Sequence, residues 1–185
     1  MALWGNSSSD EPKPKWTSDG NKTADKQNVF ATAQGWVMRH YTKADKSTHY
    51  DEILCAMSGL TTALADATIT SVHFDTKTLA RAATGQVIVA YNELVDVTSG
   101  ATLVVTASGQ SNPTATAAAQ TGTNRVEFTF TVPNAATNLS IGAQTLGGGN
   151  KIKDAGTSTN SDKVFVAGDV IGAGGSGATK TIAVA

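Results

Sequence analysis

The sequence predicts an all-β protein: a β-sandwich preceded by an extended N-terminal arm and a small β-hairpin region. From Thr68 onward charged residues become sparse, and Thr, Val, Ala and Gly dominate in runs of strand length. Gly, Asn, Pro and Ser separate these runs at the regular spacing that is typical of a sandwich. In "RVEFTFTV" apolar and polar side chains alternate, which places the apolar set on one face of a strand.

The composition divides the chain into three parts. Residues 1–28 are polar, charged and proline-containing, which favours an extended arm over a packed element. Residues 29–67 are expected to form a small β-rich region, because "GWVMRHY" and "DEILCAM" flank the polar connection "TKADKSTH". The following "TTALADA" is compatible with a short helical turn or with a loop. Residues 68–185 are expected to form the sandwich.

The strands expected in the sandwich follow one another in short runs. They are "TITSVHF", "QVIVAYN", "ATLVVTAS", "RVEFTFTV", "TNLSIGA", "KVFVAGDV" and "KTIAVA". The last of these is followed by no further residues, and a terminal strand stays ordered only when it is paired. We therefore expect it to lie in a sheet.

The bulk composition argues against two classes of partner. The formal net charge of the 185 residues is −1, and no basic stripe is present, so a role in neutralising nucleic-acid phosphates is not expected. No apolar run is long enough to span a bilayer, and "MALWGNSSSDEPK" lacks the pattern of a signal peptide. We expect a protein synthesised in the cytoplasm, with neither nucleic acid nor membrane as partner.

No set of residues has the spacing of a catalytic or metal site. The histidines, His40, His49 and His73, form no metal-binding motif, and two of them fall in the expected hairpin. No G-x-S-x-G or phosphate-loop motif occurs, so the glycine-rich stretches are interpreted as loops. We expect no enzymatic activity, no cofactor and no metal.

The carboxylates and the cysteine receive structural interpretations. No D-x-D-x-D-G run points to calcium, and nothing places two carboxylates across a cleft. The single cysteine, Cys55, has apolar neighbours and is interpreted as a small buried hydrophobe. Trp36 lies in an apolar strand and is expected in the core.

The arm "MALWGNSSSDEPKPKW" holds the candidate partner-binding residues. They are Leu3, Trp4, Pro12, Pro14 and Trp16. Tryptophan buries a large area at a small cost in rotamer entropy, so an extended segment can use it as an anchor in a partner's pocket. The alternative is that both tryptophans fold back on this protein's own sheet.

Several separate segments resemble the bacterial Ig-like repeats of large surface proteins. The matching pieces are Gly85–Gln86, "YNELVDVTSG", "ATLVV", "VEFTFTV" and "LGGGNKIKDAG", in the order that those repeats show. The resemblance covers residues 68–185 and implies an Ig-like sandwich in which Glu93 and Asp154 are residues of the fold pattern. The chain departs from the pattern at Ala101, where a proline is usual, and in the longer stretch 157–178.

The N-terminal third looks like short virion structural proteins of tailed bacteriophages. The likeness lies in "MALWGN", "KPKW", "GWVMR" and "DEILCAM", within residues 1–60. It implies a structural virion component, and we expect a capsid decoration (cement) protein on the phage head, bound to the major capsid protein. Because proteins on a closed shell usually obey its local symmetry, we expect a homo-oligomer, with a trimer favoured. The alternative is a tail- or fibre-associated protein that binds glycans on the host surface. A lytic hydrolase is a third possibility, against which the missing catalytic residues argue.

Overall fold

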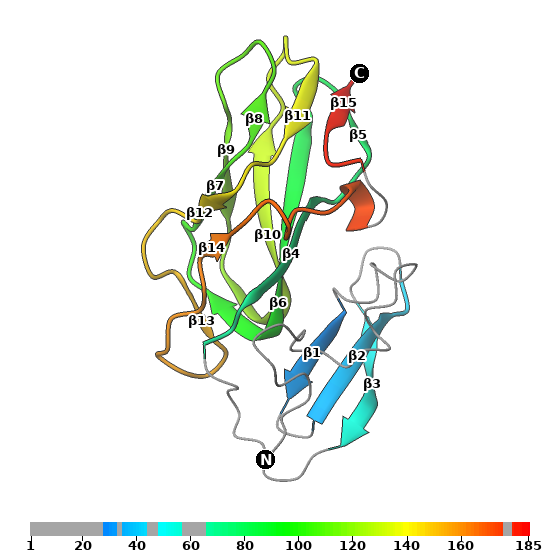
Figure 1. Cartoon of the computed structure of the whole chain (residues 1–185), viewed down its shortest axis with the longest axis vertical. Helices are drawn as coiled ribbons and strands as arrows, with labels where there is room; N and C mark the ends of the chain where they lie inside the picture. The colour runs from blue at the N-terminus through cyan, green and yellow to red at the C-terminus, as the bar shows by residue number, and fades with distance from the viewer. Residues whose placement is uncertain (1–27, 33–34, 44–47, 57–65, 176–178) are drawn as a thin grey trace.

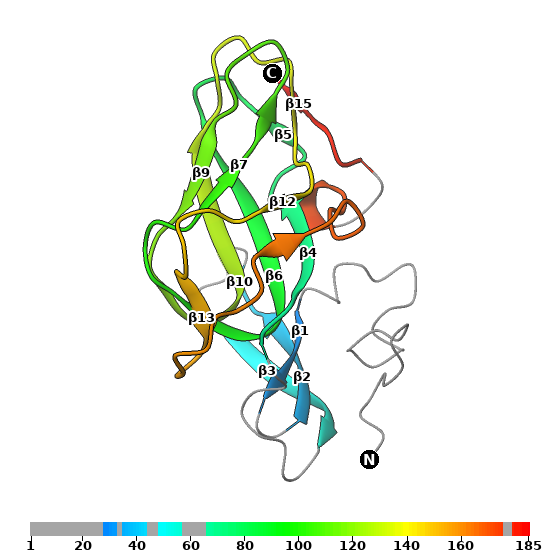
Figure 2. The same ribbon diagram turned by 60° about the vertical axis from the view of Figure 1, so that its left-hand side comes forward.

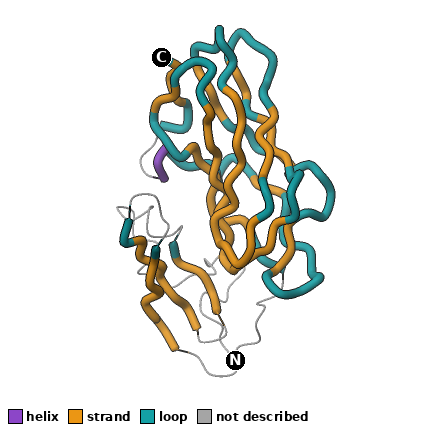
Figure 3. The backbone as a smooth tube through the Cα atoms, turned by 180° about the vertical axis from the view of Figure 1, so that it is seen from behind, coloured by secondary structure: helices purple, strands orange, loops and turns teal. Residues whose placement is uncertain are grey.

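A computed structural model describes residues 28–32, 35–43, 48–56, 66–175 and 179–185. In these residues the prediction of an all-β fold is confirmed, because strands make up the regular structure and the helical element among them is the short 3-10 turn η2 (Ala173–Gly175). A small sheet lies beside one end of a β-sandwich (Figure 1). Figure 3 shows the same division from behind.

The small sheet consists of β1 (Val29–Thr32), β2 (Gly35–Tyr41) and β3 (His49–Ala56). β2 pairs with both neighbours in antiparallel fashion, which confirms the predicted strand pair around the polar connection. The four-residue β1 was not predicted as a separate strand. "VFAT" is too short to show an alternating pattern of its own.

The larger sheet is built around β6 (Thr84–Val97), which runs along the sandwich and reaches the small sheet (Figures 1 and 2). β4 (Ile69–Phe74) and β10 (Gln120–Thr131) pair with β6 in antiparallel fashion. β9 (Thr114–Ala117) pairs with β10, and β7 (Thr102–Val104) pairs with β9. The short β13 (Ile152–Asp154) pairs with the last residues of β6.

The second sheet of the sandwich has four strands, in the order β5 (Thr78–Leu79), β15 (Ile182–Val184), β11 (Asn138–Ser140) and β8 (Thr106–Ala107). β15 lies within the last expected strand, "KTIAVA", and its pairing with both β5 and β11 confirms that this segment lies in a sheet. A separate pair is formed by β12 (Gln144–Thr145) and β14 (Val164–Phe165).

The core of the sandwich lies between these sheets. The predicted alternation in β10 is confirmed: Val126, Phe128 and Phe130 are buried, whereas Glu127 and Thr129 are exposed. The apolar face of β10 packs in one cluster with side chains from both sheets. Members of that cluster include Phe74, Val89, Leu103, Leu139, Ile152 and Ile182.

The small sheet joins the sandwich through β1 and β6. These strands pair in parallel at Ala31 and Glu93, beside the place where the β6–β10 register shifts between Thr123 and Arg125. The small sheet therefore continues the larger sheet by main-chain pairing. Ala67, at the expected boundary between the small region and the sandwich, lies in the core of the sandwich.

Two carboxylates tie the segments near this junction together. Asp96 accepts hydrogen bonds from the backbone N–H groups of Gly122 (2.8 Å) and Gly156 (2.9 Å). One oxygen of the buried Asp154 accepts from the N–H of Ala67 and from the hydroxyl of Ser161. Asp96 thus ties the 120–124 segment of β10 to the loop at Gly156, and Asp154 ties Ala67 to the segment at Ser161.

Candidate interaction surfaces

β3 is the outer strand of the small sheet and is exposed along most of its length. Tyr50 is 57% exposed and Ile53 is 51% exposed, although both lie within a strand. The two residues are an odd number of positions apart, so they project from opposite faces. No described strand pairs with the outer edge of β3, so among the described residues this strand offers both a backbone edge and apolar side chains to a partner.

One face of the small sheet carries a compact apolar cluster. Val29, Ala31 and Trp36 are buried, with Leu54 and Cys55 packed against them. The prediction that Trp36 is a core residue is confirmed. Cys55 was predicted to be buried, but it is only partly buried, because it lies at the margin of this cluster on the outer strand β3.

On the same face, nearer the connection between β2 and β3, lies an exposed cluster of polar and aromatic side chains. His40 stacks on Tyr50, with ring centroids 4.9 Å apart, and its Nε2 lies 2.7 Å from a carboxylate oxygen of Glu52. Directly opposed and diagonal neighbours of this kind are the usual contacts between antiparallel strands. They keep the solvent-facing end of β3 in register with β2.

On the opposite face Arg39 joins the two strands. Its Nε and Nη2 donate to the two carboxylate oxygens of Asp51, at 2.8 and 2.9 Å, and the guanidinium carbon lies 4.8 Å from the ring centroid of Phe30. The hydrogen bond with Asp51 raises the pKa of Arg39 above its ordinary value. The same bond lowers the pKa of the Asp51 carboxyl.

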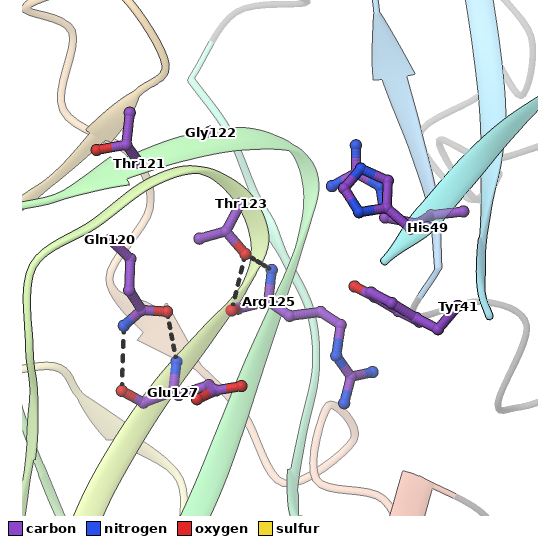
Figure 4. Close-up of a pocket in the computed structure, with 9 residues that line it drawn as sticks. Tyr41, His49, Gln120, Thr121, Gly122, Thr123, Arg125 and Glu127 are labelled. Atoms are coloured by element: carbon purple, nitrogen blue, oxygen red, sulfur yellow. Dashed lines mark hydrogen bonds between the residues drawn. The ribbon is translucent and has the colours of Figure 1, made fainter. Parts of the chain in front are cut away.

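A groove with a volume of about 410 Å³ lies between this face and β10 (Figure 4). One wall comes from the small sheet and the other from the first half of β10. The lining residues are Arg39, Tyr41, His49, Gln120, Thr121, Gly122, Thr123, Arg125 and Glu127. The rings of Tyr41 and His49 meet edge to face, with centroids 6.1 Å apart.

Side-chain hydrogen bonds within β10 shape its wall of the groove. The side chain of Gln120 accepts from the N–H of Glu127 and donates to the carbonyl of the same residue. The hydroxyl of Thr123 is bonded to both the N–H and the carbonyl of Arg125. These bonds within β10 hold its first half in place, where the pairing with β6 is irregular.

Arg125 lies on this wall and is half-buried. Figure 4 shows its side chain extending toward Tyr41, whose hydroxyl end points back across the groove. Burial lowers the pKa of the Arg125 guanidinium, although Tyr41, Asp75 and Glu127 act in the opposite direction. A partly buried guanidinium is poorly hydrated. Its interaction with an anionic group is therefore stronger than that of a fully exposed guanidinium.

The candidate anchors of the arm, Leu3, Trp4, Pro12, Pro14 and Trp16, lie outside the described residues. Their role as partner-binding residues stays a prediction. The surfaces described above were not identified from the sequence. The exposure of β3 follows from its position at a sheet edge, and the groove joins segments that are far apart in the chain.

The described residues were also searched for metal-binding groups and for membrane-spanning helices. No group of three or more His, Cys, Asp or Glu side chains is arranged to hold a metal ion among those residues. His73 is buried in β4, whereas His49 and His40 lie in the small sheet. Within the same ranges, no helix has the length and apolar character needed to cross a membrane.

Comparisons with protein-family models, curated proteins and solved structures find no match for this chain. The function has therefore to be argued from the residues themselves and from the surfaces that they form.

Proposed function

We propose that the protein is a structural virion protein that binds the outer surface of a phage head and stabilises it as a capsid decoration (cement) protein. Its main partner is the major capsid protein, and copies associate through the N-terminal region, with a trimer favoured by the local symmetry of a closed shell. The resemblance of residues 1–60 to phage virion proteins motivates the proposal. The exposed outer strand β3 is the structural observation that supports it.

β3 has the properties of a docking strand. Its free backbone edge can accept a strand from a capsid subunit or a sister copy, and the exposed Tyr50 and Ile53 supply side chains for specific pockets. Asp51 and Glu52 discourage uncontrolled pairing of the same edge, because carboxylates on an open edge oppose aggregation. These features suit β3 to pairing with a specific partner rather than to unspecific association.

Cementing needs no chemistry. Each copy that binds the assembled shell but not its free subunits shifts the equilibrium toward assembly by mass action. Many copies act together, so a modest stabilisation at each site becomes large over a whole head. The arm residues Trp4 and Trp16 would add further anchors for the partner.

The test is rebinding to purified heads that lack the protein, measured by co-sedimentation. We expect Ile53→Asp to reduce occupancy at least tenfold, because a charge would be buried in the contact. Val166→Asp is the matched control, since Val166 is 58% exposed but lies in the sandwich, and it should bind like the wild type. Trp4→Ala should likewise weaken attachment more than Thr129→Ala.

Wild-type protein that does not bind these heads would sink the proposal. If it binds but Ile53→Asp and Trp4→Ala both retain full occupancy, attachment does not use β3 or the arm. Size-exclusion chromatography with light scattering tests the oligomer separately, and a trimer is the expected result.

The second candidate function is a tail- or fibre-associated protein that binds glycans on the host surface. The groove beside Tyr41, His49 and Arg125 is the observation that favours it. Immunogold labelling of virions distinguishes the two candidates: label on the head supports the cement protein, and label confined to the tail supports the alternative.

A further inference from the structure

The groove between the small sheet and β10 combines three features that recognise one class of ligand. It has an aromatic wall, a half-buried guanidinium and exposed hydrogen-bonding groups at its rim. The volume of about 410 Å³ is within the range of roughly 300–1,000 Å³ that small-molecule sites occupy.

The aromatic wall comes from the small sheet. Tyr41 and His49 are directly opposed residues of β2 and β3, and their rings meet at 68°. Amphipathic rings of this kind offer an apolar face for the C–H groups of a sugar ring and a polar edge for its hydroxyls. By contrast, the aromatic side chains of the sandwich are all buried: Phe74, Tyr91, Phe128, Phe130 and Phe165.

The charged element comes from the sandwich. Arg125 extends from β10 toward Tyr41, as Figure 4 shows, so the guanidinium and the phenol lie on facing walls. Guanidinium groups recognise carboxylates by paired, charge-assisted hydrogen bonds. Arg39 also lines the groove, and two of its nitrogens donate to the carboxylate of Asp51.

The rim supplies partners for hydroxyl groups. Glu127 is exposed at the groove and offers a carboxylate on the wall opposite the aromatic pair. This carboxylate accepts hydrogen bonds from sugar hydroxyls, and it repels a doubly charged phosphate more strongly than a singly charged carboxylate. This mixture favours a ligand with many hydroxyls and a single negative charge over a compact inorganic anion.

We propose that this groove binds an acidic saccharide, a sugar ring that carries a carboxylate, with Tyr41 and His49 against the ring and Arg125 on the carboxylate. The inference names the ligand class of the surface that favours the second candidate function. It also holds for a protein that docks on a head through Tyr50, because Tyr50 and the residues that line the groove lie on opposite faces of the small sheet, whereas Ile53 shares the face of the groove.

The experiment uses the full chain. A glycan array with uronic- and sialic-acid oligosaccharides beside matched neutral ones is probed first, and the tightest acidic oligosaccharide is then titrated by calorimetry. The free monosaccharide acid and the corresponding polymer are titrated as separate arms, which distinguishes a free sugar acid from a surface polysaccharide as the source. Binding of the acidic sugar at least tenfold tighter than its neutral match is expected.

Two variants assign the binding to the groove. Arg125→Gln should weaken binding about tenfold and remove most of its salt dependence, and Tyr41→Leu should weaken it about fivefold, while the circular dichroism spectra stay unchanged. Tyr50→Leu, on the opposite face of the same sheet, is the matched control and should bind within about twofold of the wild type.

The proposal is overturned if no acidic saccharide binds, if neutral sugars or inorganic phosphate bind equally well, or if Arg125→Gln and Tyr41→Leu both bind like the wild type. Head rebinding of Tyr41→Leu separates this outcome from failure of the proposed function. That variant should occupy heads normally even when its saccharide binding is weakened.

Discussion

Tyr91 provides a test of the packing at the centre of the molecule. Its side chain is fully buried in β6, and its hydroxyl donates a hydrogen bond of 3.0 Å to the backbone carbonyl of Asp162. Burial raises the pKa of the phenol well above its ordinary value of 10.0. The substitution Tyr91→Phe removes the hydroxyl and leaves the ring in place.

The expected effect changes sign with pH. At pH 7 the variant should lose about 1.5 kcal/mol of unfolding free energy, the typical cost of one buried hydrogen bond whose acceptor is left unpaired. Above pH 10 the unfolded wild-type chain releases the Tyr91 proton whereas the folded chain keeps it, so wild-type stability falls by about 1.4 kcal/mol per pH unit. The variant has no such proton, and the two stability curves should cross near pH 11, about one unit above the ordinary pKa.

The assay is urea unfolding of both proteins at intervals from pH 7 to 11.5, followed by far-ultraviolet circular dichroism. Tyr50→Phe is the control, because Tyr50 is exposed and its curve should follow that of the wild type. A difference between wild type and Tyr91→Phe that stays constant over this pH range would refute the reasoning, since it would mean that the phenol ionises equally in both states.

Two further predictions concern a backbone position and an ion pair. Gly148→Ala should destabilise the fold by about 3 kcal/mol or more, because a Cβ there would collide with the carbonyl oxygen of Gly100. Gly149→Ala should cost only about 1 kcal/mol, because Gly149 has a similar positive φ but open space around it. Equal midpoints of the two variants in thermal unfolding would contradict this. Asp51→Asn should cost about 0.5 kcal/mol at pH 7 and low salt. The Asp51 pKa is lowered in the folded state, so the contribution is full above about pH 4 and disappears as the pH falls further; a difference in urea midpoints that persists at pH 2 would contradict it.

The fold class could be predicted because the signal is local. The alternation from Arg125 to Val132 directly reports which side chains face the core, and the structure has them in that arrangement. β9 was missed because "TATA" contains no large apolar residue, although Ala115 and Ala117 are buried. β6 is also longer than the apolar run "QVIVAYN", since main-chain pairing with β13 and β10 extends it through residues with weaker strand preference.

The candidate surfaces could not be predicted, because they depend on contacts between distant segments. Tyr41 and His49 belong to the small sheet, and Arg125 belongs to β10, so only the parallel pairing of β1 with β6 brings them to one groove. Parallel pairing leaves no turn signature in the sequence. The exposure of Ile53 is equally hidden, since an apolar residue in a strand is ordinarily interpreted as core.

The parallel pairing of β1 with β6 has a consequence for the order of events during synthesis. β1, β2 and β3 are joined by short connections and can associate soon after they leave the ribosome, whereas β6 follows only later. Until then both outer strands of the nascent sheet are open to wrong partners. The shortness of β1 and the carboxylates of Asp51 and Glu52 on β3 limit that hazard, so these residues protect the emerging chain before any partner is present.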